Sequence, residues 1–275
     1  MSQTIDQAFV KQYEADVHTA YQRMGSTIRP FVRISTKRPG KDITFQKIGK
    51  GTASTKTRHG DVPLMNADHT NVTVTLADYY AGDYVDKLDE LKTNIPERQI
   101  TVEAGAYALG RQTDALIVAA LDGGAINNTA INRSAITAND LTSLVARLGA
   151  KDVPIGDGNA FVAVTWLTWA KINTLTEFAN SQWVGPEFPI KVMTPMRMFA
   201  GAVWFPTSAL TITANVAKCY AFHRRAIGHG IGADVMSDIT WQGTKAAWFV
   251  NNMMSQGAVL IDALGCERLT VTENA

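Results

Sequence analysis

The sequence predicts an α+β fold, in which helices and strands are mixed without the regular alternation that builds a parallel sheet. One observation behind this prediction is a helical pattern over residues 95–122, the longest in the chain. Another is that segments before and after it alternate apolar and polar residues, as half-buried strands do. With 275 residues, 46% hydrophobic and 19% charged, the chain is long and apolar enough to bury a sizeable core.

Composition excludes several classes of protein. The net charge of +1 gives no general case for binding nucleic acid or a membrane surface. The two cysteines, Cys219 and Cys266, exclude a disulfide-built scaffold and fit a reducing compartment. The first residues lack the basic and apolar regions of a signal peptide, and no apolar run reaches membrane-spanning length. We therefore expect a globular protein without a membrane partner.

The N-terminal part begins with an expected amphipathic helix over residues 2–24, where apolar side chains recur every fourth residue. A strand is expected over 28–37. Residues 37–78 then form an expected two-stranded arm, whose strands are DITFQKIG and NVTVTLADYY and whose tip is rich in Gly, Lys, Thr and Asp. So polar a tip does not fold back into the core, and an isolated hairpin is marginal in water. We expect the arm to lie on another surface.

The long helix is preceded by a short acidic helix, expected over residues 82–93. Asn94 and Glu97 can form the capping box of the long helix, and the Gly123–Gly124 pair is expected to end it. A helix over 95–122 is roughly 42 Å long at 1.5 Å per residue. This length indicates a beam across which other elements lie.

Two glycines within the long helix, Gly105 and Gly110, leave a strip without side chains. Another backbone can approach the helix there, or the helix can bend. Together with the acidic residues at its start, this strip makes the helix a candidate seat for the arm of a neighbouring copy.

The remaining elements alternate irregularly. A loop is expected over residues 125–136, then a helix capped by Thr137 or Asn139, a buried strand NAFVAVTW, and a helix capped by Thr168. Strands are expected in FAGAVWFPTSAL, KCYAFHRRAIGHGIG and the C-terminal stretch from residue 239. The glycine-rich run 228–232 is expected to be a bend between strands.

Charge is balanced in total but not along the chain. Residues 1–60 hold 11 Lys and Arg against 4 Asp and Glu, whereas residues 61–122 hold 4 against 11. The basic side chains gather on the arm: Lys37, Arg38, Lys41, Lys47, Lys50, Lys56 and Arg58. The acidic side chains gather just after it: Asp78, Asp83, Asp86, Asp89, Glu90, Glu97 and Glu103.

Three interpretations of the arm compete. A nucleic-acid-binding arm would need aromatic residues for stacking, and Phe45 is nearly alone. A merely solvated loop would leave the acidic cluster unexplained. An arm that lies across the acidic region of a neighbouring copy accounts for both clusters, and it predicts a homo-oligomer with salt-sensitive assembly. We favour the third interpretation.

No pattern indicates an active site, so no catalytic residue, metal or cofactor is expected. The Gly49–Gly51 run lacks the spacing of a phosphate-binding loop. His223, His229 and Asp234 are the best candidates for an enzyme or a metal site, but two histidines without a third ligand at fitting spacing are a weak signal.

The order of these features resembles the major capsid proteins of tailed bacteriophages with the HK97-type fold. The stretch AFHRRAIGHGIGADVMSDITWQGTKAAWFVNNMMSQGAVLIDALGCERLTV is similar to the C-terminal region of that family, and FQKIGKGTASTKTRHGDVPLMNADHTNVTVTLADYYAGDYVDKLDEL to its arm. The resemblance covers nearly the whole chain, and the order of the motifs carries it. It implies five parts: an N-terminal arm (1–36), an extended E-loop hairpin (37–78), a peripheral domain (79–136) with the spine helix (95–122), an axial domain (137–222) and C-terminal strands returning to the peripheral domain (223–275).

The resemblance implies a coat protein that assembles as pentamers and hexamers into an icosahedral shell around double-stranded DNA; the alternative is an encapsulin-like compartment shell. The implied partners are further copies, a separate scaffolding protein, a portal protein and packaged DNA contacted without sequence specificity. The implied location is the virion capsid, after assembly in the bacterial host cytoplasm. The resemblance also raises a covalent cross-link between Lys47, Lys50 or Lys56 and a neighbour's Asn251 or Asn252, although no sequence feature singles these residues out.

Overall fold

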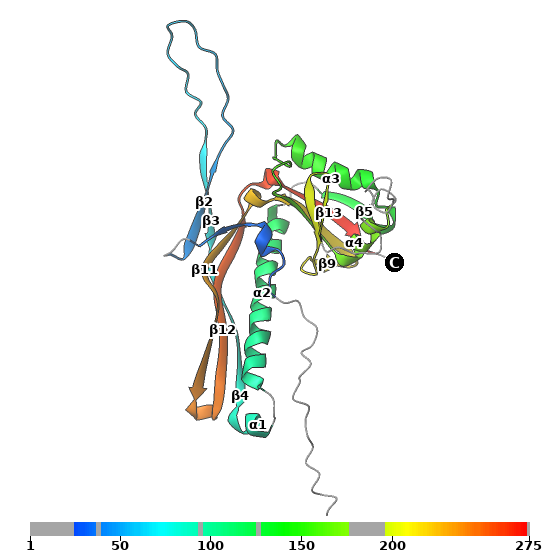
Figure 1. Ribbon diagram of the computed structural model, residues 1–275. Coiled ribbons are helices and arrows are strands. Elements are labelled where there is room, and N and C mark those ends of the chain that lie inside the picture. Colours follow the sequence, from blue (N-terminus) through cyan, green and yellow to red (C-terminus); the bar gives the residue numbers. More distant parts are fainter. Residues whose placement is uncertain (1–24, 37–39, 93–95, 125–127, 176–195, 274–275) are drawn as a thin grey trace, which may run out of the picture.

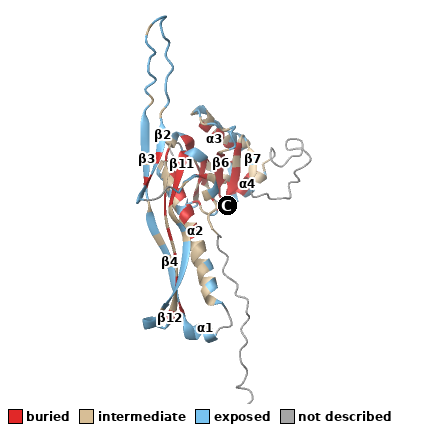
Figure 2. Cartoon of the chain, turned by 60° about the vertical axis from the view of Figure 1, so that its left-hand side comes forward, coloured by how far each residue is buried: buried red, intermediate tan, exposed pale blue. Residues whose placement is uncertain are grey.

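The computed structural model describes residues 25–36, 40–92, 96–124, 128–175 and 196–273. The expected helix over 2–24 lies outside these residues. The described chain forms an elongated sheet with a long helix along it, a second sheet unit at one end of that helix, and a hairpin arm that projects beyond both (Figure 1). Buried residues concentrate in the second unit and along the middle of the body, whereas the arm is mostly exposed (Figure 2).

The elongated sheet has four strands in the order β1-β11-β12-β4. Their bounds are β1 (Arg33–Ser35), β11 (Ile227–Gln242), β12 (Ala247–Leu260) and β4 (Ala77–Asp86). β1 runs parallel to β11, and the other neighbours are antiparallel. The sheet therefore joins segments from both ends of the described chain.

The long helix, α2 (Glu97–Gly124), confirms the expected beam. Its expected capping residue, Asn94, lies outside the described residues. At its other end the helix continues through both glycines that were expected to end it. Its fully buried residues begin at Leu109, so the second half belongs to the core and the first half is only partly covered.

The glycine strip on α2 is filled by the chain itself, so the strip is not a seat for a neighbour's arm. A Cβ atom on Gly110 would lie 2.6 Å from the backbone of Gly25, and one on Gly105 would lie 2.0 Å from the amide nitrogen of Asn252. The side chain of Asp114, one turn further on, is buried and accepts hydrogen bonds from the backbone N–H groups of Thr27 (2.9 Å) and Ile28 (3.1 Å). These contacts fix the segment that enters the fold at residue 25.

The expected acidic helix over 82–93 is wrong in its first half. Residues 82–86 belong to β4, where Tyr84 and Val85 pair with Phe249 and Trp248 of β12. Only α1 (Lys87–Lys92) is helical. The charged residues gave a helical pattern, but the aromatic and β-branched residues between them favour the sheet.

The second unit is built on a seven-stranded sheet in the order β5-β13-β10-β6-β8-β7, with β9 paired to β10. Its strands are β5 (Asn128–Asn132), β6 (Ala160–Val164), β7 (Arg197–Phe199), β8 (Ala202–Pro206), β9 (Ile212–Thr213), β10 (Val216–His223) and β13 (Cys266–Thr272). Residues 125–136, expected to be a loop, thus contain a strand. Within the expected C-terminal part (223–275), β11 and β12 lie in the four-stranded sheet and β13 pairs with β10 of the seven-stranded sheet. The expected division into domains stays a prediction.

Two short helices belong to this unit. Helix α3 (Ala138–Ala150) begins with the expected Thr137 cap, and Asp140 completes a capping box. Helix α4 (Trp166–Asn173) is capped by Thr165, which accepts from the N–H of Thr168, so the expected cap was three residues too late. Asp122 at the end of α2 joins the beam to the sheet, because it accepts from Lys218 (2.6 Å), Tyr220 (3.2 Å) and Arg268 (3.0 Å).

The arm consists of β2 (Asp42–Ile48) and β3 (His69–Thr75), paired in register over seven residues, and an exposed tip over 49–68. Its root packs on the body through Ile43, Phe45 and Val74, which are each less than 5% exposed. The expected bend between strands over 228–232 is wrong, since these residues lie within one continuous strand, β11, whose pairing with β12 shifts register only from Ile231 onward. A Cβ atom on Gly228 would lie 2.6 Å from Phe45. The absence of side chains at Gly228 and Gly230 therefore allows the arm root to pack closely against β11.

Candidate assembly surfaces

The expected basic residues of the arm fall into two groups. Lys47 and Lys50 sit at its root and pair within their own chain: Lys47 Nζ lies 2.9 Å from Asp262 Oδ1, and Lys50 binds Asp152. The hydrogen bond from Lys50 lowers the pKa of Asp152 below its usual range. These two lysines are therefore already occupied within the chain. Lys37 and Arg38 lie outside the described residues.

The remaining arm cations face solvent. Lys41, Lys56 and Arg58 are exposed, and none of the described carboxylates pairs with their side chains. Lys56 and Arg58 belong to the tip over 49–68, which projects beyond the body that carries the arm (Figure 1). Their charge is available to another molecule.

The expected acidic residues gather mainly at the end of the body opposite the arm, around α1 and the last residues of β4 (Figure 1). We call this part of the chain the acidic end. The exposed ones are Asp78, Asp83, Asp86, Asp89 and Glu103, and Glu90 and Glu97 are half-buried. Two of them have cationic partners: Glu90 accepts from Arg98 (2.7 Å), and Asp89 from Lys92 (3.1 Å). Asp78 differs from the others because it lies near the start of β4, beside the arm root.

Arm tip and acidic end lie at opposite ends of one elongated chain (Figure 1). A rigid arm that points away from its own body cannot reach that chain's acidic end. The basic cluster of one copy can therefore contact the acidic cluster of another copy, but it cannot contact the acidic cluster of its own chain.

Exposed apolar side chains lie beside both the basic cluster of the arm tip and the acidic cluster. They were not among the residues predicted from the sequence. At the tip, Val62, Leu64 and Met65 are 73%, 81% and 61% exposed. At the acidic end, large exposed side chains lie beside the carboxylates: Tyr80, Tyr84, Leu88, Leu91 and Trp241. The run of Val, Pro, Leu and Met inside an otherwise polar tip was the available signal. Apolar patches of this kind are typical of protein contact surfaces.

The acidic end also holds stacked aromatic rings that cations cover. Trp241 and Trp248 meet edge to face with ring centroids 5.2 Å apart, and Arg98 lies 5.0 Å from the Trp248 ring. Lys245 lies 3.7 Å above the Tyr84 ring. These contacts stiffen the hairpin between β11 and β12 and so give this end a defined shape.

The histidines do not form a common site. His223 is bonded to Asp157 (3.1 Å), whereas His229 is buried and bonded to Gln256 (3.1 Å). Asp234 pairs with Arg29 instead. Among the described residues there is no group of three or more side chains suited to hold a metal ion. In the same part of the chain, every helix is too short or too polar to cross a membrane.

One proposed cross-link acceptor is unsuitable. Asn252 is buried, and its amide bonds to Ser237 and to the carbonyl of Ala81 (3.2 Å). A lysine from a neighbouring copy has no access to it. Asn251 is half-buried and stays an untested candidate.

Comparisons with known proteins agree with this architecture. A family model described as "Phage capsid protein" matches residues 5–273. The structure is similar to the capsid of the cyanophage P-SCSP1u, with a TM-score of 0.76, 14% identity and coverage of 98% of this chain and 94% of that one. It is also similar to the chain from Mycobacterium phage Che8 (TM-score 0.73, 16% identity, 96% and 97% covered) and to the capsid of the native GTA particle (TM-score 0.74, 10% identity, 96% of both). No curated protein matches the chain in a sequence comparison.

An elongated sheet with a beam helix, a second sheet unit and a projecting arm define a shell-forming coat protein. The chain belongs to the phage capsid protein family, has the HK97-like fold and is a major capsid protein. It self-associates into capsomers of an icosahedral shell and is located in the virion capsid. These findings give no support to the alternative of an encapsulin-like compartment.

Proposed function

We propose that each copy holds the shell together by laying its arm tip on the acidic end of a neighbouring copy. The observation that carries this proposal is the placement of the two clusters at opposite ends of one elongated chain (Figure 1). Lys56 and Arg58 supply the charge of the tip, since Lys47 and Lys50 are engaged within their own chain. The partner surface is centred on Asp83, Asp86 and Glu103. Beside them lie Glu97 and the two carboxylates that pair within their own chain, Asp89 and Glu90, with Asp78 nearer the arm root.

Charge selects the partner, and apolar contact adds most of the stabilisation. An exposed ion pair contributes only about 0.2–1 kcal/mol. Full burial of a Val, Leu or Met side chain contributes about 1.5–3 kcal/mol. Val62, Leu64 and Met65 at the tip therefore outweigh its two cations once the tip is seated against Tyr84, Leu88 or Leu91. The charges set the orientation and the rate of encounter.

Contact between different surfaces of identical copies is heterologous, so it closes into rings or continues into open chains. We infer that such rings are the pentamers and hexamers of the shell, and that the shell encloses double-stranded DNA. We also infer that a separate scaffolding protein and a portal protein take part in assembly in the bacterial host cytoplasm. The chain has a structural role in this proposal and no catalytic one.

The test is charge reversal at both surfaces. Lys56→Glu with Arg58→Glu is expected to abolish or strongly reduce shells seen by electron microscopy, while circular dichroism of the protein stays unchanged. The matched control, Lys56→Arg with Arg58→Lys, keeps the charge and is expected to assemble normally. Raising the salt to about 1 M shortens the screening length to about 3 Å and is expected to slow assembly of the native chain.

The complementary variant, Asp83→Lys with Glu103→Lys, is expected to fail alone and to form shells with the reversed arm when the two are combined in one chain. Normal shells from the reversed arm by itself, at native yield and salt dependence, would refute the charge pairing.

A further inference from the structure

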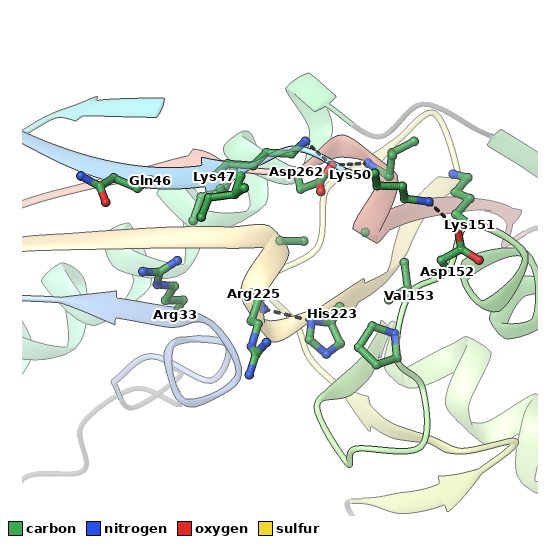
Figure 3. A pocket seen from close by; sticks show the side chains of 16 residues that line it. Arg33, Gln46, Lys47, Lys50, Lys151, Asp152, Val153, His223, Arg225 and Asp262 are labelled. Atoms are coloured by element: carbon green, nitrogen blue, oxygen red, sulfur yellow. Dashed lines mark hydrogen bonds and ion pairs between the residues drawn. The ribbon is translucent and has the colours of Figure 1, made fainter. Parts of the chain in front are cut away.

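A pocket of about 420 Å³ lies at the root of the arm (Figure 3). Its wall has three sources. The arm contributes residues 46–48 and Lys50, the four-stranded sheet contributes Arg33 of β1, and the seven-stranded unit contributes residues 151–154 after α3. The turns after β10 and β12 complete it. The pocket therefore lies where the arm and both sheet units meet.

The lining is strongly basic. Five Lys and Arg side chains face two carboxylates, Asp152 and Asp262: Arg33, Lys47, Lys50, Lys151 and Arg225. Both carboxylates form ion pairs with the arm lysines, Asp262 with Lys47 and Asp152 with Lys50. Lys151 binds Glu267, a buried residue outside the lining. Three of the five cations are thus neutralised within the chain.

Arg33 and Arg225 are the remaining cations, and no described carboxylate pairs with either of them. Figure 3 shows both on the side of the pocket opposite the arm lysines. Arg33 also lies 5.5 Å from the Phe45 ring, which holds its stem beside the arm root. The backbone N–H of Arg225 donates to His223 Nδ1 (3.2 Å), which fixes the turn that carries Arg225. Both side chains are exposed, so a ligand reaches them from solvent.

The orientation of the His223 ring follows from its contacts. Because Nδ1 accepts the Arg225 N–H, the ring proton sits on Nε2 and is donated to Asp157 at 3.1 Å. The backbone N–H of Asn159 and this contact lower the pKa of Asp157 to about 2, so Asp157 is ionised. His223 is thus a polar lining residue that is held at both ring nitrogens.

We propose that this pocket binds a phosphate-type oxyanion on Arg33 and Arg225, opposite the paired arm lysines. A planar guanidinium presents paired N–H donors that match the oxygens of phosphate. Val153, Pro154 and Ile261 form apolar walls, which strengthen such bonds. No Phe, Tyr or Trp side chain lines the pocket, so it recognises the oxyanion and not a stacked base.

Binding would connect the arm to both sheet units at one point. Lys47 already joins the arm to the turn after β12, and Lys50 joins it to the loop after α3. A bound oxyanion adds Arg33 of the elongated sheet and Arg225 of the turn after β10 to the same cluster. The ligand therefore fixes the direction in which the arm leaves the body.

Thermal unfolding of the full-length protein in increasing inorganic phosphate tests the proposal, with chloride at equal ionic strength as the reference. Native protein is expected to show a saturable rise of the unfolding temperature, because a ligand of the folded state stabilises it. Arg33→Gln with Arg225→Gln is expected to weaken phosphate binding at least tenfold, since both charged hydrogen-bond donors to the anion are lost. Lys171→Gln on α4 removes a half-buried cation outside the pocket and is expected to change nothing.

Asp152→Asn is a second variant with the opposite expected sign. Asp152 is exposed, so the change is tolerated, and it frees Lys50 for the ligand. Phosphate is expected to bind about two- to fivefold more tightly, as loss of one exposed ion pair allows.

A short DNA duplex replaces phosphate in a parallel titration. Arginine-dependent binding of the duplex but not of free phosphate would assign the oxyanion to a phosphodiester, whereas the reverse would assign it to a free anion. Equal responses of the native protein and the double arginine variant to both ligands would overturn the proposal. So would a phosphate response that chloride reproduces.

Discussion

Gly228→Ala is a direct test of how the arm is seated. The new methyl group would lie 2.6 Å, 2.7 Å and 2.8 Å from three carbon atoms of the Phe45 ring. Ordinary contacts between carbon atoms lie at about 3.5–4.0 Å. The Phe45 side chain is buried, with 2% of its surface exposed, and packs in a cluster with Ile43, Val74 and Ile261. The clash must therefore be relieved either by strain at the arm root or by release of the arm.

Strain at the arm root costs less free energy than release of the arm. Overpacking a filled site costs about 1–3 kcal/mol. Release of the arm exposes Ile43, Phe45 and Val74, and at about 1.5–3 kcal/mol each this costs about 5–9 kcal/mol. Replacement of Gly by Ala also stabilises by about 0.4–1 kcal/mol, because the unfolded chain loses freedom. We expect Gly228→Ala to lower the free energy of unfolding by about 1–2 kcal/mol with the arm still seated.

Urea unfolding measures this effect, with Gly156→Ala as the matched control. Nothing lies within 4 Å of a Cβ atom at Gly156, so the control carries only the effect on the unfolded chain. A lower midpoint with an unchanged slope indicates strain, whereas a lower slope indicates that the arm has left the body. If Gly228→Ala were as stable as Gly156→Ala, the close approach of Phe45 would be refuted. Phe45→Leu is expected to relieve part of the clash in the double variant.

Three further outcomes follow from buried or capping groups. Asp114→Ala leaves the N–H groups of Thr27 and Ile28 without their acceptor and is expected to cost about 3 kcal/mol in urea unfolding; a loss below about 1 kcal/mol would contradict this role. The hydrogen bond from Lys218 holds the pKa of Asp122 below 3.8, so its contribution is present above that pH and is lost as the pH falls through the folded pKa. Asp122→Asn is accordingly expected to be about 1–2 kcal/mol less stable than the native chain at pH 7, with the difference shrinking in unfolding experiments below pH 3.8, and a constant difference would argue against the ion cluster. Thr137→Ala is expected to cost about 1 kcal/mol and Thr137→Ser almost nothing, as thermal unfolding would show, and equal losses would exclude the cap.

Local signals predicted the elements that depend on neighbours in sequence. The long helix rests on apolar spacing of three and four residues, and the cap of α3 by Thr137 on its place just before a helical pattern. The arm strands follow from alternation over seven residues each. The basic cluster of the arm and the acidic cluster that follows it were found by counting charged residues along the sequence. These features follow from short-range chemistry, so the sequence suffices for them.

Elements that depend on distant partners were missed. The strand at Asn128–Asn132 is polar and short, and it exists because β13 pairs with it from about 140 residues away. The glycine run in β11 looks like a bend until Phe45 and Val74 are known to lie against it. Likewise, nothing near Lys47 or Lys50 indicates that Asp262 and Asp152 are their partners. Pairings of this kind are fixed by the tertiary fold and leave no local pattern.

The order of the strands also constrains how a nascent chain folds. β4 and β1 must wait for β12 and β11, so the four-stranded sheet is incomplete until residue 260 has left the ribosome. β5 must wait for β13, so the seven-stranded sheet is incomplete until residue 272 has done so. Such long-range pairing is slow and leaves strand edges open meanwhile. The acidic end, which needs β12 behind β4, is therefore absent from a shorter nascent chain. Incomplete chains lack the surface that would receive an arm, and this protects the growing shell from copies that are still being synthesised.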